Sequence, residues 1–280
     1  MTDAPAAVAT THRIEFDGER VVKTYNSWAR GEPLREWRGL TLLHEYAPGL
    51  GPAPIAARLD LEPPSIVMSR VPGESLGTRP VTPDQLDALA EALQQLHASV
   101  PEKRLADVEP QNDPASFDEL LHRAFAARAH AASETEPMVR RAVAAARAFL
   151  DSGWVGRCAG IGEPSPVFAM NDGNLANYLW DGACVRVVDL ESAGRLDRAF
   201  DLSDFVEHIS ARAHAGIRAQ ELLGRLGLRP DECARIRAYR PAFAVFWLLR
   251  LLPGGGAARR NPPGTLAAQA AHLLALPAAD

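Results

Sequence analysis

The sequence predicts an α+β fold made of a small antiparallel sheet followed by a larger, mainly helical part. Two observations predict it. Short apolar segments flank Asp17-Gly18, and an Asp-Gly pair between such segments is a strong hairpin signal. From Thr82 onward the chain is mainly of helical periodicity, interrupted by a second hairpin around Asp181-Gly182. We expect two units, 1–71 and 72–280.

The composition is that of an ordinary globular protein. Its 280 residues are 47% hydrophobic and 23% charged, so the chain can bury a substantial core. The net charge of −5 argues against general nucleic-acid binding and is compatible with a cationic small substrate. No signal peptide and no membrane-spanning run is indicated, and three scattered cysteines form no metal or disulfide pattern. We expect a cytoplasmic protein without a nucleic-acid or membrane partner.

The N-terminal unit is expected to hold four strands and one helix. Two strands, 12–16 and 20–25, flank the first hairpin turn. Two more are expected at 54–59 and 65–70. A helix over about 34–47 separates the two pairs and is ended by Pro and Gly.

Two charged residues of this unit are expected to be buried together. Of the 30 basic residues only two are lysines, Lys23 and Lys103, so a lysine kept within a strand stands out. On the following helix Glu36 falls on the apolar stripe, whereas Glu45 points the opposite way. A buried acid needs a counter-charge, so we expect Glu36 to pair with Lys23. The alternative is that Glu36 is exposed to solvent.

The C-terminal unit begins with a recognisable helix start. Thr82-Pro83-Asp84-Gln85 has the pattern of a capping box, and the helix it begins ends near His97. We expect His97 to be structural, buried and hydrogen-bonded. Further helices are expected within 116–150, 221–226 and 231–252, the last with Tyr239, Phe243, Phe246 and Trp247 in the core.

The most informative stretch is 167–201. Asn177 follows Asp172 by five positions, a hairpin comes next, and Asp189 ends an apolar strand. A two-residue turn would pair Asn177 with Arg186 and place Asp189 beside the loop that holds Asp172. This set of side chains is typical of kinase catalytic and metal-binding loops. The alternative is a polar turn capped by its own Asx side chains.

This stretch resembles the aminoglycoside phosphotransferase family, which has a bilobal protein-kinase-like fold. The family pattern His-Gly-Asp-x-x-x-x-Asn corresponds to Met170-Asn171-Asp172 with Asn177, and Ile-Asp-Phe/Trp-Glu corresponds to Val188-Asp189-Leu190-Glu191. The family elements Gly-Asp-Pro and Asp-Leu-Ala look like Leu196-Asp197-Arg198 and Asp201-Leu202-Ser203.

The resemblance implies a kinase that moves the γ-phosphate of ATP or GTP to a hydroxyl group. Asp172 would be the catalytic residue that accepts the hydroxyl proton, and Asn177 and Asp189 would bind Mg²⁺. No glycine cluster precedes the strand lysine, so the nucleotide lid would be short, with the Asp17-Gly18 turn in its place. The nucleotide-binding residues would be Lys23, Glu36, Met68 and Arg70.

Two positions near the catalytic loop have roles that the sequence leaves open. Met170 stands where the family has His; it can fill the volume but donates no hydrogen bond. We expect activity to survive with a looser metal loop, because Asp172 is intact. Asp201 either braces the catalytic loop, as the resemblance implies, or caps a helix.

The expected acceptor is a cationic antibiotic, either an aminoglycoside or a basic cyclic peptide of the capreomycin or viomycin type, so that the protein would give antibiotic resistance. An acidic strip after the hairpin favours a polycation. One alternative is a kinase of a small metabolic alcohol or amino alcohol of the choline, homoserine or sugar type. Another is a non-catalytic, pseudokinase-like protein that binds nucleotide. The sequence does not identify the acceptor hydroxyl, the nucleotide or the oligomeric state. The acids expected to bind substrate are Glu191, Asp197, Asp204 and Glu207.

Overall fold

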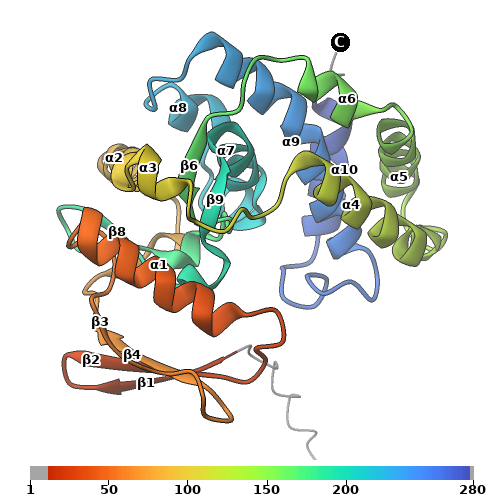
Figure 1. Ribbon diagram of the computed structural model, residues 1–280. Helices are drawn as coiled ribbons and strands as arrows, with labels where there is room; N and C mark the ends of the chain where they lie inside the picture. Colours follow the sequence, from red (N-terminus) through yellow and green to blue (C-terminus); the bar gives the residue numbers. More distant parts are fainter. Residues whose placement is uncertain (1–11, 278–280) are drawn as a thin grey trace, which may run out of the picture.

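The computed structural model of the protein describes residues 12–277. The expectation that the N-terminus carries no signal peptide concerns residues of which most, 1–11, lie outside this range. No helix in the described part is long and apolar enough to cross a membrane. Figure 1 shows the sheet and helix α1 on one side and the larger, mainly helical part on the other. The predicted α+β fold is confirmed.

The N-terminal hairpin forms one edge of a four-stranded antiparallel sheet. The strand order is β1-β2-β4-β3, and helix α1 lies between this sheet and the helical part (Figure 1). All four strands and the helix were predicted to within two residues. Their bounds are β1 (His12–Asp17), β2 (Arg20–Tyr25), α1 (Glu32–Tyr46), β3 (Pro54–Arg58) and β4 (Ser65–Ser69).

The rest of the chain consists mainly of helices, with two small sheets formed by strands within 74–75 and 166–197. One sheet has the order β5-β7-β8 and the other pairs β6 with β9. The strands are β5 (Glu74–Ser75), β6 (Pro166–Ala169), β7 (Tyr178–Trp180), β8 (Val185–Val187) and β9 (Gly194–Asp197). The helices are α2 (Pro83–Ser99), α3 (Glu102–Leu105), α4 (Pro114–Arg128), α5 (Pro137–Leu150), α6 (Trp154–Ala159), α7 (Arg198–Glu207), α8 (Ala219–Leu223), α9 (Pro230–Leu251) and α10 (Thr265–Ala275).

We propose that the two units meet just after Val71. β4 ends at Ser69 in the first sheet, whereas the next strand, β5, pairs with β7 of the C-terminal part. Helix α2 then begins with the predicted capping box: Thr82 Oγ1 accepts a hydrogen bond from Gln85 N, and the Gln85 side chain accepts one from Thr82 N.

The second hairpin has a wider turn than expected, so its predicted register is wrong. Tyr178 lies opposite Val187, and Arg186 opposite Leu179 rather than Asn177. The carboxylate of Asp181 accepts hydrogen bonds from the backbone of both Ala183 and Cys184, and this Asx turn closes a four-residue loop.

The corrected register brings the polar residues of the hairpin closer together. Val188 N donates to Asn177 O at 2.9 Å, so Asn177 lies beside the residue that precedes Asp189. Both side chains therefore reach the same end of the hairpin, which faces the N-terminal sheet.

Candidate active site

Lys23 lies at the centre of a buried cluster of charges between β2 and α1. Its side chain is 2% exposed. The ammonium Nζ lies 2.5 Å from Glu36 Oε2 and 3.2 Å from Glu191 Oε2, and it also forms a hydrogen bond with the Asp189 carboxylate. Glu36 is fully buried and, besides its bond with Lys23, accepts a hydrogen bond from the Tyr25 hydroxyl. Glu45, the other acid considered on α1, is exposed. The expected contact between Lys23 and Glu36 is present. Burial disfavours the charged lysine, but the three carboxylates outweigh burial and raise the pKa of Lys23.

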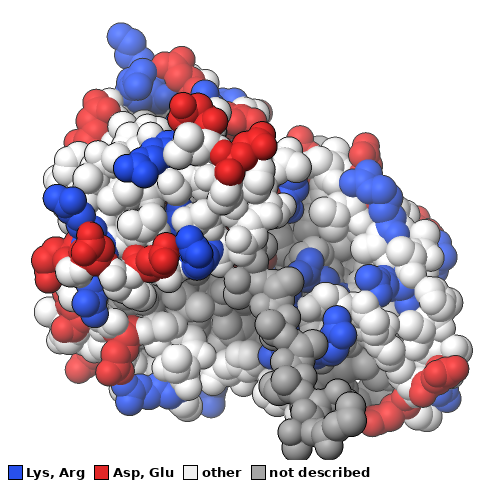
Figure 2. Space-filling model, turned by 90° about the horizontal axis from the view of Figure 1, so that it is seen from below, with Lys and Arg blue, Asp and Glu red and all other residues white. Residues whose placement is uncertain are grey.

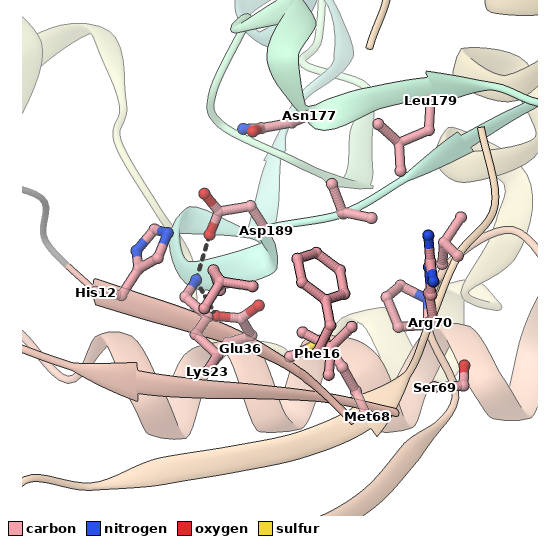
Figure 3. Close-up of a pocket in the computed structure, with 15 residues that line it drawn as sticks. His12, Phe16, Lys23, Glu36, Met68, Ser69, Arg70, Asn177, Leu179 and Asp189 are labelled. Atoms are coloured by element: carbon pink, nitrogen blue, oxygen red, sulfur yellow. Dashed lines mark hydrogen bonds and ion pairs between the residues drawn. The ribbon is translucent and has the colours of Figure 1, made fainter. Parts of the chain in front are cut away.

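A cavity of about 270 Å³, which we call the donor cavity, opens beside this cluster. Figure 3 shows Lys23 and Asp189 at one end and Arg70 at the other, with Phe16 of β1 and Met68 between them. All six residues predicted to bind nucleotide or metal line this one cavity: Lys23, Glu36, Met68, Arg70, Asn177 and Asp189.

Two carboxylates and one imidazole at the lysine end of the donor cavity could hold a divalent cation. His12, Asp189 and Glu191 each offer a ligand atom, and the three atoms lie within 4.8 Å of one another. Carboxylate and amide oxygens are preferred by Mg²⁺, and Asn177 lines the same cavity. Sequence reasoning assigned Glu191 to the acceptor and missed His12, because no sequence pattern places the first strand beside the metal loop.

Asp172 is held by hydrogen bonds from its own loop. Its Oδ1 accepts from Asn174 N at 3.0 Å, and its Oδ2 accepts from the Asn177 side-chain nitrogen at 3.1 Å. Burial raises the pKa of Asp172 to about 6, although the Asn174 N–H acts in the opposite direction. Asn171 and Asp189 both adopt the left-handed backbone region, with φ of 52° and 65°. Such conformations are uncommon outside glycine and cluster at functional sites.

Helix α7 supports the catalytic loop from behind. Asp201 Oδ1 accepts from Asn171 N at 3.1 Å, and its Oδ2 lies 2.8 Å from Nε2 of the buried His97. Asp201 lies inside α7 and does not cap it, so of its two expected roles only the bracing role agrees with the structure. Met170 is fully buried, and the backbone after it is held by Asp201. A Cβ on Gly173 would lie 2.7 Å from Phe205 Cα, so only glycine fits this approach to α7.

Two of the four acids expected to bind substrate form internal ion pairs instead. Asp197 Oδ2 lies 2.8 Å from Arg235 Nη2, and its Oδ1 caps α7. Glu207 is 0% exposed and lies 2.7 Å from Arg240 Nε and 2.6 Å from His272 Nε2. Each carboxylate already has an arginine partner on α9, so in this arrangement neither acid is free to bind a cationic substrate.

The other two acids lie on different sides of the catalytic loop. Glu191 belongs to the lysine cluster beside the donor cavity. Asp204 lines a second cavity of about 360 Å³, together with Asp172, and its Oδ2 accepts from Gly173 N at 3.1 Å. We call this the acceptor cavity. Asp204 is the one substrate candidate among the four acids that borders it.

Sequence reasoning also missed most of the acceptor cavity. Phe243, Phe246 and Trp247 were expected to be core residues; they do pack on the core, but they also line this cavity. Arg250 at the end of α9 and Arg260 in the following loop line it as well. The helical spacing of these aromatic residues indicated that their face of α9 is shielded from solvent. It did not indicate that part of this face lines a cavity.

The comparison that decides the family is a match to a family model. Residues 7–241 match the model described as "Phosphotransferase enzyme family". The chain belongs to this family. No curated protein matches the chain.

Solved structures of phosphotransferases share the fold at low sequence identity. A choline/ethanolamine kinase family protein from Mesorhizobium loti is similar with a TM-score of 0.65 and 17% identity, over 96% of this chain and 86% of that one. The AMP-bound spectinomycin phosphotransferase follows with a TM-score of 0.62 and 14% identity, over 91% and 87%. Choline kinase LicA from Streptococcus pneumoniae is similar with a TM-score of 0.57 and 15% identity, over 96% and 90%. The similarity confirms the phosphotransferase fold.

The β1–β2 hairpin covers the donor cavity where kinases have a glycine-rich loop. Phe16 is 67% exposed yet lines the cavity, and the Arg70 guanidinium lies 5.4 Å from the centre of its ring. We expect Phe16→Ala to weaken binding of a Mg²⁺-ATP analogue roughly three- to tenfold, by loss of an aromatic contact. Calorimetric titration measures this. Leu61→Ala, which removes an apolar side chain that is 49% exposed elsewhere, is the control. An unchanged affinity in Phe16→Ala would contradict a lid role.

The second expected outcome concerns pH and Asp204. Burial, with the nearby charges of Asp172 and Asp201, raises the pKa of Asp204 to about 8, against about 3.9 in an unfolded chain. Because its pKa is raised, the folded protein binds the Asp204 proton more tightly than the unfolded chain does. This contribution to the stability of the fold is fully present below the unfolded pKa and is lost as pH rises through the folded pKa. The free energy of unfolding of the wild type, relative to Asp204→Asn, should therefore fall between about pH 4 and pH 8. Urea unfolding of both proteins at several pH values measures the difference; a difference that is independent of pH contradicts the shift.

Proposed function

We propose that the protein transfers the γ-phosphate of ATP or GTP to a hydroxyl group of a small molecule, with Asp172 as the catalytic residue. The position of Asp172 between two cavities carries this proposal. Asp172 lines the acceptor cavity, and its carboxylate is bonded to Asn177, which lines the donor cavity. A phosphoryl group held in the donor cavity would therefore lie next to a hydroxyl held at Asp172.

The donor side is arranged to bind nucleotide phosphates. Lys23, kept charged by Glu36, supplies a compact cation, and Met68 and Arg70 line the part of the cavity away from the lysine, where the base would lie. Asn177 and Asp189, with Glu191 nearby, would hold Mg²⁺, which when bound offsets the negative charge on the phosphates. In the protein alone Lys23 bonds Asp189 directly, so Lys23 would turn toward the phosphates when nucleotide binds.

On the acceptor side Asp172 orients the hydroxyl and takes its proton. A pKa of about 6 leaves the carboxylate mostly ionised at neutral pH and close to the operating pH, which suits a general base. Asp201 fixes the loop through Asn171 N, and this support does not depend on the residue at position 170. We therefore propose that the loop works with Met170 in place of the family His.

Two acceptor classes remain within this proposal. Solved structures with a similar fold include spectinomycin phosphotransferase in complex with ADP and spectinomycin, and a choline kinase. A cationic antibiotic, with resistance as the outcome, is supported only by Asp204, since Asp197 and Glu207 are paired internally. A small metabolic alcohol is favoured by the acceptor cavity, whose volume of about 360 Å³ lies at the lower end for ligand sites. The three free cysteines agree with a reducing, cytoplasmic setting.

An assay of Mg²⁺-dependent ADP or GDP release tests the proposal. Purified full-length protein is offered ATP or GTP with two panels, one of cationic antibiotics and one of small metabolic alcohols. We expect acceptor-dependent release of ADP or GDP and a phosphorylated product for at least one panel. Antibiotic resistance in a host that expresses the protein would identify a cationic antibiotic as the acceptor. Tight nucleotide binding without turnover on any acceptor would support the pseudokinase alternative and refute the enzyme.

A further inference from the structure

Two arginines of the acceptor cavity, Arg250 and Arg260, have no carboxylate partner within ion-pair distance among residues 12–277. The side chain of Arg260 makes one hydrogen bond to the described residues, from its Nε to Gly256 O at 3.1 Å. Arginines elsewhere in this chain, such as Arg235, are fixed by carboxylates. These two therefore remain available to a ligand.

Arg250 is held in place by aromatic rings. Its guanidinium carbon lies 5.2 Å from the centre of the Phe246 ring and 5.8 Å from that of Trp247. Stacking of this kind orients the planar group without satisfying its N–H donors. Its Nε is buried and has no hydrogen-bond acceptor among the described residues. An unsatisfied buried donor of a charged group is costly, so an acceptor group supplied by a ligand would be favoured.

Two further donors belong to the same wall. Trp247 is 8% exposed, and its indole N–H has no acceptor within residues 12–277. His208 stands edge-on to it, with ring centres 4.4 Å apart. Nδ1 of His208 accepts from Ser210 N at 3.1 Å, and burial lowers the pKa of His208 to about 3. The ring is therefore neutral and carries its proton on Nε2, which donates.

The acids of the cavity do not balance this wall. Of the two acids that line the cavity, Asp204 has a pKa that burial raises to about 8 and is mostly neutral at pH 7, so the Asp172 carboxylate alone faces two arginines. In Figure 2, several Lys and Arg side chains lie on the right of the molecule, beside the hollow between the two parts. A polycation would meet unpaired arginines here, whereas an anion would meet the guanidinium groups of Arg250 and Arg260.

We propose that the acceptor is a small hydroxyl compound that also carries an anionic group, a carboxylate or a phosphate, and that Arg250 and Arg260 bind this group while Asp172 receives the hydroxyl. The inference rests on the proposed function, and it names the substrate class of the same site. The aromatic wall adds a flat apolar surface on which the body of the acceptor packs. The arginines would also offset repulsion between an anionic acceptor and the nucleotide phosphates.

A charge-sorted acceptor screen tests this inference. Full-length protein with Mg²⁺-ATP or Mg²⁺-GTP is assayed for ADP or GDP release on sets of hydroxyl compounds that share a scaffold and differ in one substituent. The substituents are a carboxylate, a phosphate monoester, a neutral amide and an ammonium group. For each compound that is turned over, kcat/KM is then measured in Arg260→Gln and in a matched control, Arg259→Gln. Arg259 is the exposed neighbour of Arg260 in sequence and does not line the cavity. Arg260 is changed first because Arg250 also packs on two rings.

We expect the carboxylate or the phosphate member of a set to be preferred; which of the two is preferred identifies the anion. Arg260→Gln should lower kcat/KM for it about ten- to a hundredfold, the range for a lost hydrogen bond to a charged group, while Arg259→Gln leaves it unchanged. Turnover confined to neutral or ammonium compounds, or an equal loss in the two variants, would overturn the inference and leave the proposed function standing. No turnover on any compound, with nucleotide binding intact, would overturn both.

Discussion

Replacing Asp172 by Asn is expected to lower kcat by about 10²- to 10⁴-fold, the usual contribution of a positioned general base. The Asn side chain keeps the shape of Asp172, and its oxygen can still accept from Asn174 N or from the Asn177 amide. It cannot take the proton of the acceptor hydroxyl. The loss should therefore appear in kcat, because the donor cavity keeps all of the residues that line it.

The measurement is steady-state turnover of the best acceptor, with the melting temperature as a check on folding. Asp84→Asn is the matched control, since Asp84 is an exposed acid in the first turn of α2 and lies far from the catalytic loop in sequence. A decrease of less than about tenfold in Asp172→Asn, against the 10² minimum for a general base, would show that another group accepts the proton.

Replacing Asp197 by Ala is expected to destabilise the protein by about 3–5 kcal/mol, the cost of breaking a buried ion pair. The side chains of Asp197 and Arg235 are 9% and 5% exposed, and Arg235 lies 38 positions away on α9. Without Asp197, Arg235 would keep its hydrogen bonds to the carbonyls of Ile161 and Gly162 but would have no counter-charge. The cap of α7 at Ala199 N would be lost as well.

Urea unfolding measures this cost. Glu74→Ala is the control: its pair with Arg79 joins side chains that are 74% and 67% exposed, so the change should be about 0–1 kcal/mol. The result also separates a structural role from a substrate role. An Asp197→Ala protein of unchanged stability but raised acceptor KM would restore the sequence-based expectation that Asp197 binds substrate.

Local patterns in the sequence were sufficient for much of the fold and for part of the site. The Asp17-Gly18 turn, the capping box at Thr82 and the apolar stripe of α1 each depend on residues a few positions apart. The stripe was enough to choose Glu36 over Glu45 as the buried acid, because an acid on that face needs a cation. Asp172, Asn177 and Asp189 were found because their spacing follows a known catalytic loop, and the structure brings them together around the two cavities.

The errors arose where side chains act on partners distant in sequence or on the backbone itself. The Asp181 carboxylate bonds two backbone N–H groups and so widened the turn, which shifted the register of the hairpin. The acidic strip looked free to meet a polycation because the arginines that pair with Asp197 and Glu207 come from α9, far along the chain. Nothing in the sequence around Asp197 or Glu207 indicates which cation it meets.

The sequence by itself determined the fold class, the lysine–glutamate pair and the order of the catalytic residues, because each follows from local periodicity or fixed spacing. The tertiary structure alone decided which acids are free and which charges face the acceptor. Helical spacing shows that the face of Trp247 is covered, but whether protein or a cavity covers it depends on how α9 packs against α7 and the catalytic loop. Ionic partners are likewise set by packing, since a charge pairs with its neighbour in space whatever the distance along the chain.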